Sequence, residues 1–110
     1  MKSTLAPNKR YLLVRLAGER PVDGRQARAE VARHIEAFFG IEGMAQAQPR
    51  ILDKLCKDDR LVLRCARGEE MRLVAALALL GKISGMNARA KVVKISGTLR
   101  ALGAMSTEGE

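Results

Sequence analysis

Apolar residues recur with two different periods along this chain, and the order in which the periods alternate limits the folds it can adopt. In residues 10–17 (RYLLVRLA), Leu12, Val14 and Leu16 are in phase at every second position, which indicates a half-buried strand. A helix, two strands, a second helix and a last strand follow by the same criteria. The order β-α-β-β-α-β predicts an α+β, ferredoxin-like sandwich, with an antiparallel sheet carrying two main helices on one face.

The first helix has a clear start and a clear stop. Asp23 is a good N-cap and Gln26 stands three residues later, a variant of the capping box. A helical stripe of apolar residues then runs to Phe38, and Gly40 is expected to end the helix as a left-handed cap. Residues 41–48 (IEGMAQAQ) are expected to add no more than one helical turn.

Residues 50–56 (RILDKLC) and 60–67 (RLVLRCAR) are expected to form a hairpin around Asp58-Asp59. A two-residue turn would place Cys56 opposite Leu61 and Leu52 opposite Cys65, so the two sulfurs would be out of register for a disulfide. We therefore interpret both cysteines as small apolar core residues.

The second helix is expected to open after Gly68 and to be apolar nearly all round over residues 71–83. Gly81 and Gly85 should weaken and then stop it, before a last strand over 88–96. One sheet and one helix cannot cover so much apolar surface, which favours a protein interface. Its candidate residues are Met71, Val74, Leu77 and Ala78.

At 110 residues the chain is expected to be a single domain, 1–110. We expect residues 1–8 and 104–110 to be flexible tails around a core over 9–103. No stretch approaches the length of a transmembrane helix, and residues 1–10 lack an apolar signal-peptide stretch, so we expect a cytoplasmic protein without membrane contact.

The net charge of +8, from 20 Lys and Arg against 12 Asp and Glu, indicates a polyanionic partner. The aromatic residues are few, and the third expected strand (RLVLRCAR) holds no ring on which a base could stack. Binding through phosphates is therefore expected, without readout of sequence and with steep salt dependence. The candidate residues for binding the phosphates of such a partner are Lys9, Arg10, Arg15, Arg60, Arg64, Arg67, Lys91, Lys94, Ser96, Gly97, Thr98 and Arg100.

Other kinds of site are weakly indicated. His34 lies on the apolar stripe of the first helix and is interpreted as a packed residue. No catalytic residue and no metal site is predicted, because neither a nucleophile with an orienting acid nor a Cys-x-x-Cys pair is present. Residues 22–28 (VDGRQAR) lie where acylphosphatases of the same fold carry a phosphate loop, so an enzyme of that kind, with Arg28 on the phosphoryl group, stays an alternative. A pure protein-interaction or dimerisation module is a further alternative.

Five segments in order resemble ribonuclease P protein component 2, the small ferredoxin-like subunit of archaeal and eukaryotic ribonuclease P. They are residues 9–16 (KRYLLVRL), 39–48 (FGIEGMAQAQ), 61–67 (LVLRCAR), 77–85 (LALLGKISG) and 94–102 (KISGTLRAL).

The resemblance implies a subunit of a ribonucleoprotein that removes the 5′ leader of precursor tRNA. It implies that the RNA, with its own Mg²⁺, performs the hydrolysis, and that the protein itself binds no cofactor. The implied partners are ribonuclease P RNA with its precursor tRNA, a TIM-barrel-like protein subunit (component 3), and a second copy of the chain, as a homodimer within a heterotetramer.

The Ser96-Gly97-Thr98 turn admits two interpretations. Gly97 could adopt a conformation closed to other residues while Ser96 or Thr98 caps the segment that follows, leaving N–H groups free to receive an RNA phosphate with Lys94 and Arg100 nearby. Alternatively, the turn merely redirects the chain.

Overall fold

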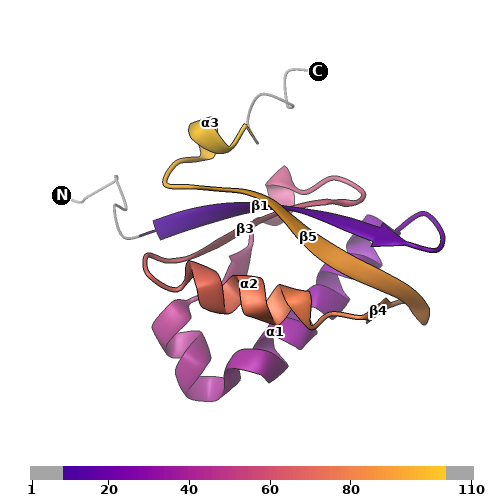
Figure 1. Ribbon diagram of the computed structural model, residues 1–110, viewed down its shortest axis with the longest axis horizontal. Helices are drawn as coiled ribbons and strands as arrows, with labels where there is room; N and C mark the ends of the chain where they lie inside the picture. Colours follow the sequence, from indigo (N-terminus) through magenta and orange to yellow (C-terminus); the bar gives the residue numbers. More distant parts are fainter. Residues whose placement is uncertain (1–8, 104–110) are drawn as a thin grey trace.

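The computed structural model describes residues 9–103 as a five-stranded antiparallel sheet with helices α1 and α2 on one face (Figure 1). The strand order is β2-β3-β1-β5-β4, so β1 and β3 lie inside the sheet. The expected ferredoxin-like α+β fold is confirmed, and the expected tails lie outside the described residues. The elements are β1 (Lys9–Gly18), α1 (Gly24–Ala47), β2 (Arg50–Ile51), the 3₁₀ helix η1 (Asp53–Leu55), β3 (Arg60–Ala66), α2 (Glu70–Ala78), β4 (Lys82–Ile83), β5 (Met86–Ser96) and α3 (Leu99–Leu102).

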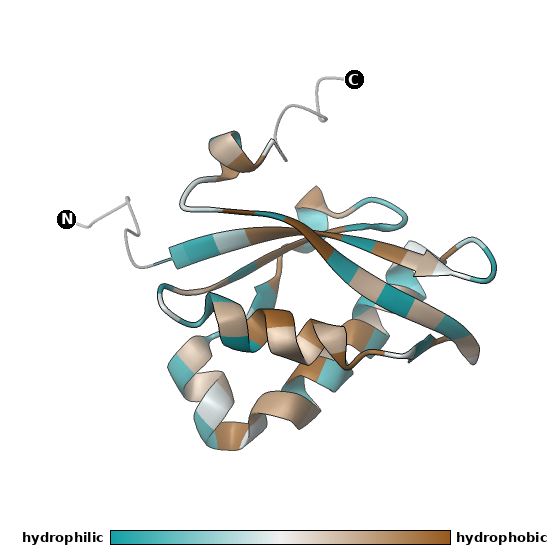
Figure 2. Cartoon of the chain, in the orientation of Figure 1, coloured by the Kyte–Doolittle hydropathy of each residue, from teal (hydrophilic) through white to brown (hydrophobic). Residues whose placement is uncertain are grey.

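The core lies between the sheet and the two long helices. Leu12, Val14 and Leu16 of β1 are almost fully buried, as their alternation predicts, and they pack with the apolar stripe of α1 and with Leu73 and Leu77 of α2. Figure 2 shows the same alternation as changing colour along β1 and β5. Each such leucine contributes about 1.5–3 kcal/mol by leaving water, so this face holds the fold together.

Helix α1 begins and bends where its sequence indicates, but it does not stop at Gly40. The carboxylate of Asp23 accepts a hydrogen bond from the Arg25 backbone N–H at 3.2 Å, which confirms the predicted N-cap. Gly40 has a positive φ of 72° but a ψ of −179°, so it bends the helix and is not the predicted left-handed cap; Gln48 has that conformation instead. However, residues 41–47 form a further helical segment of about two turns, because Gly43 and Ala47 are small enough to be buried. The expectation of at most one turn is therefore wrong.

The hairpin between β2 and β3 has a different register from the one predicted. Lys57 and Arg60 face each other beside the turn as expected, but η1 interrupts the first strand. As a result Ile51 pairs with Leu63, and the Leu52 backbone N–H donates to the Val62 carbonyl oxygen. The predicted pairing of Leu52 with Cys65 is wrong, because sequence alternation did not reveal the inserted turn.

Helix α2 is shorter than predicted and has one buried side. It ends at Ala78, before Gly81, and the chain turns at Gly85 into an additional hairpin of β4 and β5. Leu77 is 1% exposed and belongs to the core, so its assignment to a protein interface is wrong.

The second face of the sheet carries a small apolar cluster. Val62 and Leu102 are buried there, and Tyr11, Leu13 and Leu99 pack around them. Helix α3 thereby lies against the face of the sheet that α1 and α2 leave open (Figure 1).

Candidate nucleic-acid interface

The register of the sheet brings predicted bases from three strands into one row. Arg15 of β1 lies opposite Arg60 of β3 and opposite Lys91 of β5. Residues that face each other in an antiparallel pair have their side chains on the same side of the sheet. All three therefore belong to the second face, which we call the basic face and define by Arg15, Arg60, Arg64, Lys91 and Lys94.

Lys94 joins this face because of an irregularity in β5. Val14 pairs with Val92, but Leu13 pairs with Lys94, so the register shifts at Val93. A bulge of this kind inserts one unpaired residue and changes which positions face the same way. Without it, Lys91 and Lys94 would point to opposite sides of the strand.

Arg64 lies next to the apolar cluster of this face, opposite Tyr11. Its Nε atom is buried and has no hydrogen-bond partner within residues 9–103. A buried donor without a partner costs free energy unless a ligand or water satisfies it. Arg50 of β2 pairs with Arg64 and adds a base that the sequence interpretation missed, because the assumed hairpin register placed it elsewhere.

Two of the bases already have contacts within the chain. Arg15 lies 3.7 Å from a carboxylate oxygen of Asp59, and both side chains are exposed. The Arg60 guanidinium donates to the Leu55 carbonyl oxygen at 2.8 Å, which holds it beside η1. Exposed ion pairs are weak, so Arg15 stays accessible to a competing phosphate.

Arg10 and Lys9 differ from the other predicted bases. Arg10 pairs with Cys65 on the helical side and its Nε lies 3.4 Å from Glu70, so it does not lie on the basic face, and its contact with RNA stays a prediction. The Lys9 ammonium donates to the Gln48 side-chain oxygen at 2.7 Å. Arg67 is exposed in the turn after β3.

The Ser96-Gly97-Thr98 turn is organised by its own side chains. The Thr98 hydroxyl accepts from the Ala101 backbone N–H at 3.0 Å and caps α3, and the Ser96 hydroxyl accepts from the Thr98 N–H at 3.2 Å. The predicted cap is confirmed. Gly97 does not have a positive φ, so the predicted special conformation is wrong; instead, a Cβ there would lie 3.3 Å from the Arg10 guanidinium. A phosphate contact at this turn stays a prediction, with Arg100 exposed beside it.

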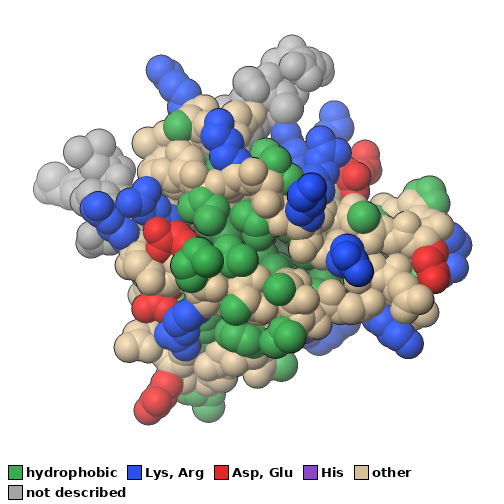
Figure 3. Space-filling view, in the orientation of Figure 1, with side chains coloured by type: hydrophobic (Ala, Val, Ile, Leu, Met, Phe, Trp, Pro, Cys, Tyr) green, Lys and Arg blue, Asp and Glu red, His purple; other side chains and the backbone are tan. Residues whose placement is uncertain are grey.

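The other residues that were predicted to form a protein interface lie on the outer side of α2. Met71 and Ala78 are exposed and Val74 is half-buried. Figure 3 shows apolar side chains gathered over α2 and the middle of β5, with Lys and Arg beside them. Leu79, which follows the last residue of α2 and is 67% exposed, belongs to this surface but was not among the predicted residues.

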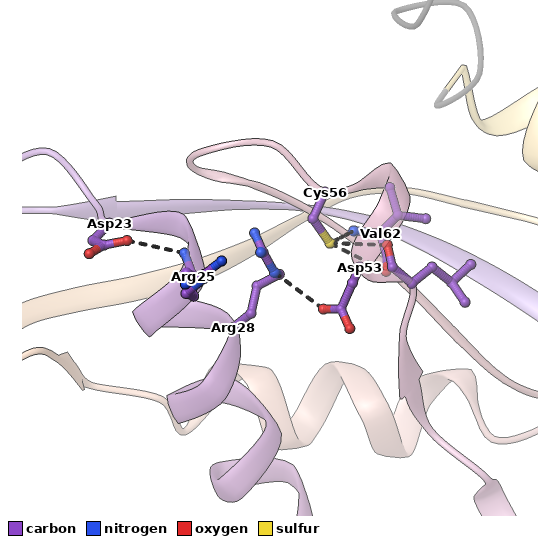
Figure 4. A network of polar contacts seen from close by, with 7 residues as sticks. Asp23, Arg25, Arg28, Asp53, Cys56 and Val62 are labelled. Carbon is purple, nitrogen blue, oxygen red and sulfur yellow. Dashed lines mark hydrogen bonds and ion pairs between the residues drawn. The ribbon is translucent and has the colours of Figure 1, made fainter.

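The acylphosphatase-like alternative is not supported at the start of α1 (Figure 4). The Asp23 carboxylate occupies the helix N-terminus, where it would repel a phosphoryl group. Arg28 is turned to Asp53, with its Nε 3.2 Å from the carboxylate. The two groups that would hold the phosphate are thus already paired with acids.

The cysteines and His34 are structural. Cys65 is buried and Cys56 half-buried, and both are free thiols. The Cys56 sulfur lies 3.4 Å from both the Leu52 carbonyl oxygen and the Val62 backbone nitrogen (Figure 4), and burial raises the pKa of its thiol. His34 Nε2 lies 2.6 Å from the Ala76 carbonyl oxygen, joining α1 to α2, which agrees with its interpretation as a packed residue.

Within residues 9–103, no cluster of three or more His, Cys, Asp or Glu is arranged to hold a metal ion. Over the same range, no helix has the length and hydropathy needed to cross a membrane.

Comparisons with known proteins agree with one another. Residues 10–105 match the Rpp14/Pop5 family. A ribonuclease P protein component 2 from Methanocorpusculum labreanum is 31% identical over 99 residues, which cover 90% of this chain and 66% of that protein. A second, from Methanosphaerula palustris, is 28% identical, and the match covers 61% of that protein, so the chain spans less than two thirds of the length of these two relatives. A third, from Thermococcus gammatolerans, is also 28% identical, and the match covers 82% of that protein. A chain in the cryo-EM structure of yeast ribonuclease MRP has the same fold, with a TM-score of 0.64 at 12% identity over 98% of this chain and 95% of that one.

Proposed function

This chain belongs to the Rpp14/Pop5 family, and on that premise we propose that it is a protein subunit of ribonuclease P. In that role it binds and supports the RNA that removes the 5′ leader from precursor tRNA. It contributes no catalytic group of its own.

The basic face is the observation that carries the proposal. Arg15, Arg60, Arg64, Lys91 and Lys94 come from three adjacent strands, and the strands offer them few acids. Tyr11 is the one aromatic residue of β1, and it is half-buried among the apolar residues under α3. A surface of guanidinium and ammonium groups without an open ring suits a folded RNA, whose backbone presents phosphates at its surface.

We propose its partners and localisation as well. The chain works with ribonuclease P RNA and its precursor tRNA, and with the TIM-barrel-like component 3. It forms a homodimer within a heterotetramer with that subunit. Mg²⁺ is held by the RNA, and the assembly is cytoplasmic.

Single-turnover cleavage of precursor tRNA tests the proposal. The host's ribonuclease P RNA and component 3 are assayed with and without this chain, at one fixed salt and Mg²⁺ concentration. We expect a large rise in rate when the chain is added, and a loss of at least tenfold in RNA affinity for Arg64→Gln combined with Lys94→Gln. Arg25→Gln combined with Arg33→Gln removes the same charge from exposed positions of α1 and serves as the control. If the rate does not rise although both proteins are shown to be folded, the proposed role as a ribonuclease P subunit is contradicted.

A further inference from the structure

Strand β5 leaves most of its outer edge open. On its inner side it pairs with β1 along nearly its whole length, whereas β4 pairs only with Asn87 and Met86. The Ala88 backbone N–H donates to the Gly81 carbonyl oxygen, and within residues 9–103 no strand pairs with the outer edge beyond that point. Because backbone groups alternate in direction along a strand, the N–H and C=O groups of Ala90 and Val92 point to this open edge.

The open edge borders a groove that is apolar between α2 and β5 and also has Glu19, Asn87, Arg89 and Lys91 in its lining. Val74, Ala78 and Leu79 line its helical side and Ala90 and Val92 line its strand side. The same two elements expose further large apolar side chains: Met71 of α2 is 71% exposed, and Val93 and Ile95 of β5 are 52% and 40% exposed. Figure 3 shows apolar side chains gathered over α2 and the middle of β5. Apolar residues of this size are seldom left together in water without a partner.

The edge and the groove together indicate which kind of molecule could bind here. An alternating row of N–H and C=O groups is matched by another polypeptide in extended conformation, and not by RNA, whose backbone offers no alternating donors. On an added strand, every second side chain would enter the groove against α2. The side chains between them would lie on the other face, opposite Arg89 and Lys91 of β5.

The charge of β5 disfavours a second copy of the same strand. Two β5 edges paired with each other would bring Arg89, Lys91 and Lys94 of one copy against those of the other. Like charges opposite each other across a strand pair are destabilising, and such residues commonly protect an edge from self-association.

We propose that β5 is a docking edge for an extended segment of a different protein, in which apolar residues alternate with Asp or Glu. The segment would add a sixth strand, place its apolar residues in the groove between α2 and β5, and place its carboxylates beside Arg89 and Lys91. The inference rests on the proposed function only in that the chain works within an assembly containing other proteins. It does not depend on RNA binding.

A labelled heptapeptide of alternating Glu and Val tests the proposal with the full chain by fluorescence anisotropy. We expect saturable binding that is at least tenfold weaker for a peptide with Lys in place of Glu, and for one of the same composition with its three Val grouped together. Val92→Pro removes the outward N–H at an edge position where proline is tolerated, and it should lower affinity at least tenfold. Val92→Thr keeps the N–H and the branched side chain, and should bind within about twofold of the parent.

If the Val92→Pro variant does not fold, hydrogen exchange of the backbone amides of the parent chain, measured by NMR, tests the same proposal. Bound peptide should slow exchange at Ala90 and Val92. Equal binding of the grouped peptide, or protection elsewhere in the chain, would overturn the proposal. A dimer in sedimentation that Val92→Pro dissociates would also overturn it, by assigning the edge to a second copy. Arg64→Gln separates the two proposals, since it should weaken RNA binding and leave peptide binding intact.

Discussion

Lys91 and Lys94 lie on the same face of the sheet although they stand three positions apart on β5. In a regular strand, residues separated by an odd number of positions face opposite sides. The register shift between Leu13 and Val14 of β1, opposite Val93, restores a common face for the two lysines. The bulge therefore concentrates positive charge on the side of the sheet that carries Arg15, Arg60 and Arg64.

The salt dependence of RNA binding should report this arrangement. Replacing Lys91 and Lys94 together by Gln removes two phosphate contacts, and each contact contributes about 0.7–0.9 to the slope of log affinity against log salt. We expect the slope to become shallower by about 1.5 for ribonuclease P RNA, measured by filter binding between about 50 and 200 mM salt. The matched pair Arg25→Gln and Arg33→Gln removes the same charge from α1. An equal change in slope for both pairs would indicate that net charge, and not the basic face, binds the RNA.

Helix α3 should depend on one buried side chain. Leu102 is 2% exposed and packs against Val62 on the second face. Leu102→Ala should lower the free energy of unfolding by about 2–3 kcal/mol, from lost burial and the cavity left behind. Leu79→Ala removes the same atoms from a side chain that is 67% exposed, and should change stability by less than about 0.5 kcal/mol. Urea denaturation checks both. If the two variants lose the same amount, α3 is not held to the sheet by Leu102.

The sequence predicted the fold well where alternation or a helical stripe was strong. The alternation in residues 10–17 specifies one buried face, and that face lies as expected. The stripe of α1 is buried as expected from Ala27 to Ile35, but its predicted last residue is wrong: Phe38 is 38% exposed, and Phe39 is buried in its place. The predictions fail where a short local turn changes which residues lie opposite each other or where an element ends. The 3₁₀ turn η1 shifts the hairpin register, and the short β4 hairpin replaces the expected end of α2.

The residues of the candidate site could be chosen from the sequence by type, but the face of the sheet on which each one lies could not. Lys91 and Lys94 could be selected from the sequence as bases of the last strand, but their common side depends on a bulge at Val93 that the sequence pattern does not indicate. Arg10 differs from Arg15 by an odd number of positions on β1, so alternation alone could have assigned it to the helical side. Arg50 was missed because its partner Arg64 is known only once η1 is known.

Gly40 should be required for the bend in α1. Its φ of 72° and ψ of −179° fall in a region nearly closed to other residues, and a Cβ there would meet nothing within 4 Å. Gly40→Ala should therefore cost about 1–3 kcal/mol through backbone strain alone. Gly81→Ala is the control, because Gly81 also has open space but no positive φ, and it should change stability by less than about 0.5 kcal/mol. Equal effects in thermal unfolding would contradict the role of backbone strain at Gly40.

Cys65 should make the fold sensitive to alkaline pH. Burial, assisted by the nearby Glu70 and Glu69 charges, raises the pKa of its thiol from 9.0 to about 11. The unfolded chain then releases the thiol proton at lower pH than the folded chain does. The stability from the neutral thiol is complete below about pH 9 and is lost as the pH rises toward 11. At pH 10 the loss should be about 1 kcal/mol relative to pH 7.5.

Urea unfolding of the parent chain and of Cys65→Ala at pH 7.5 and pH 10 isolates this contribution. Cys65→Ala should be less stable at pH 7.5, because it leaves a cavity, but it should lose about 1 kcal/mol less than the parent between the two pH values. Every other ionisable group is the same in both proteins, so the contributions of these groups cancel in the difference. Parallel losses in the two proteins would show that the Cys65 thiol stays neutral in the unfolded chain as well, or ionises in the folded one without cost.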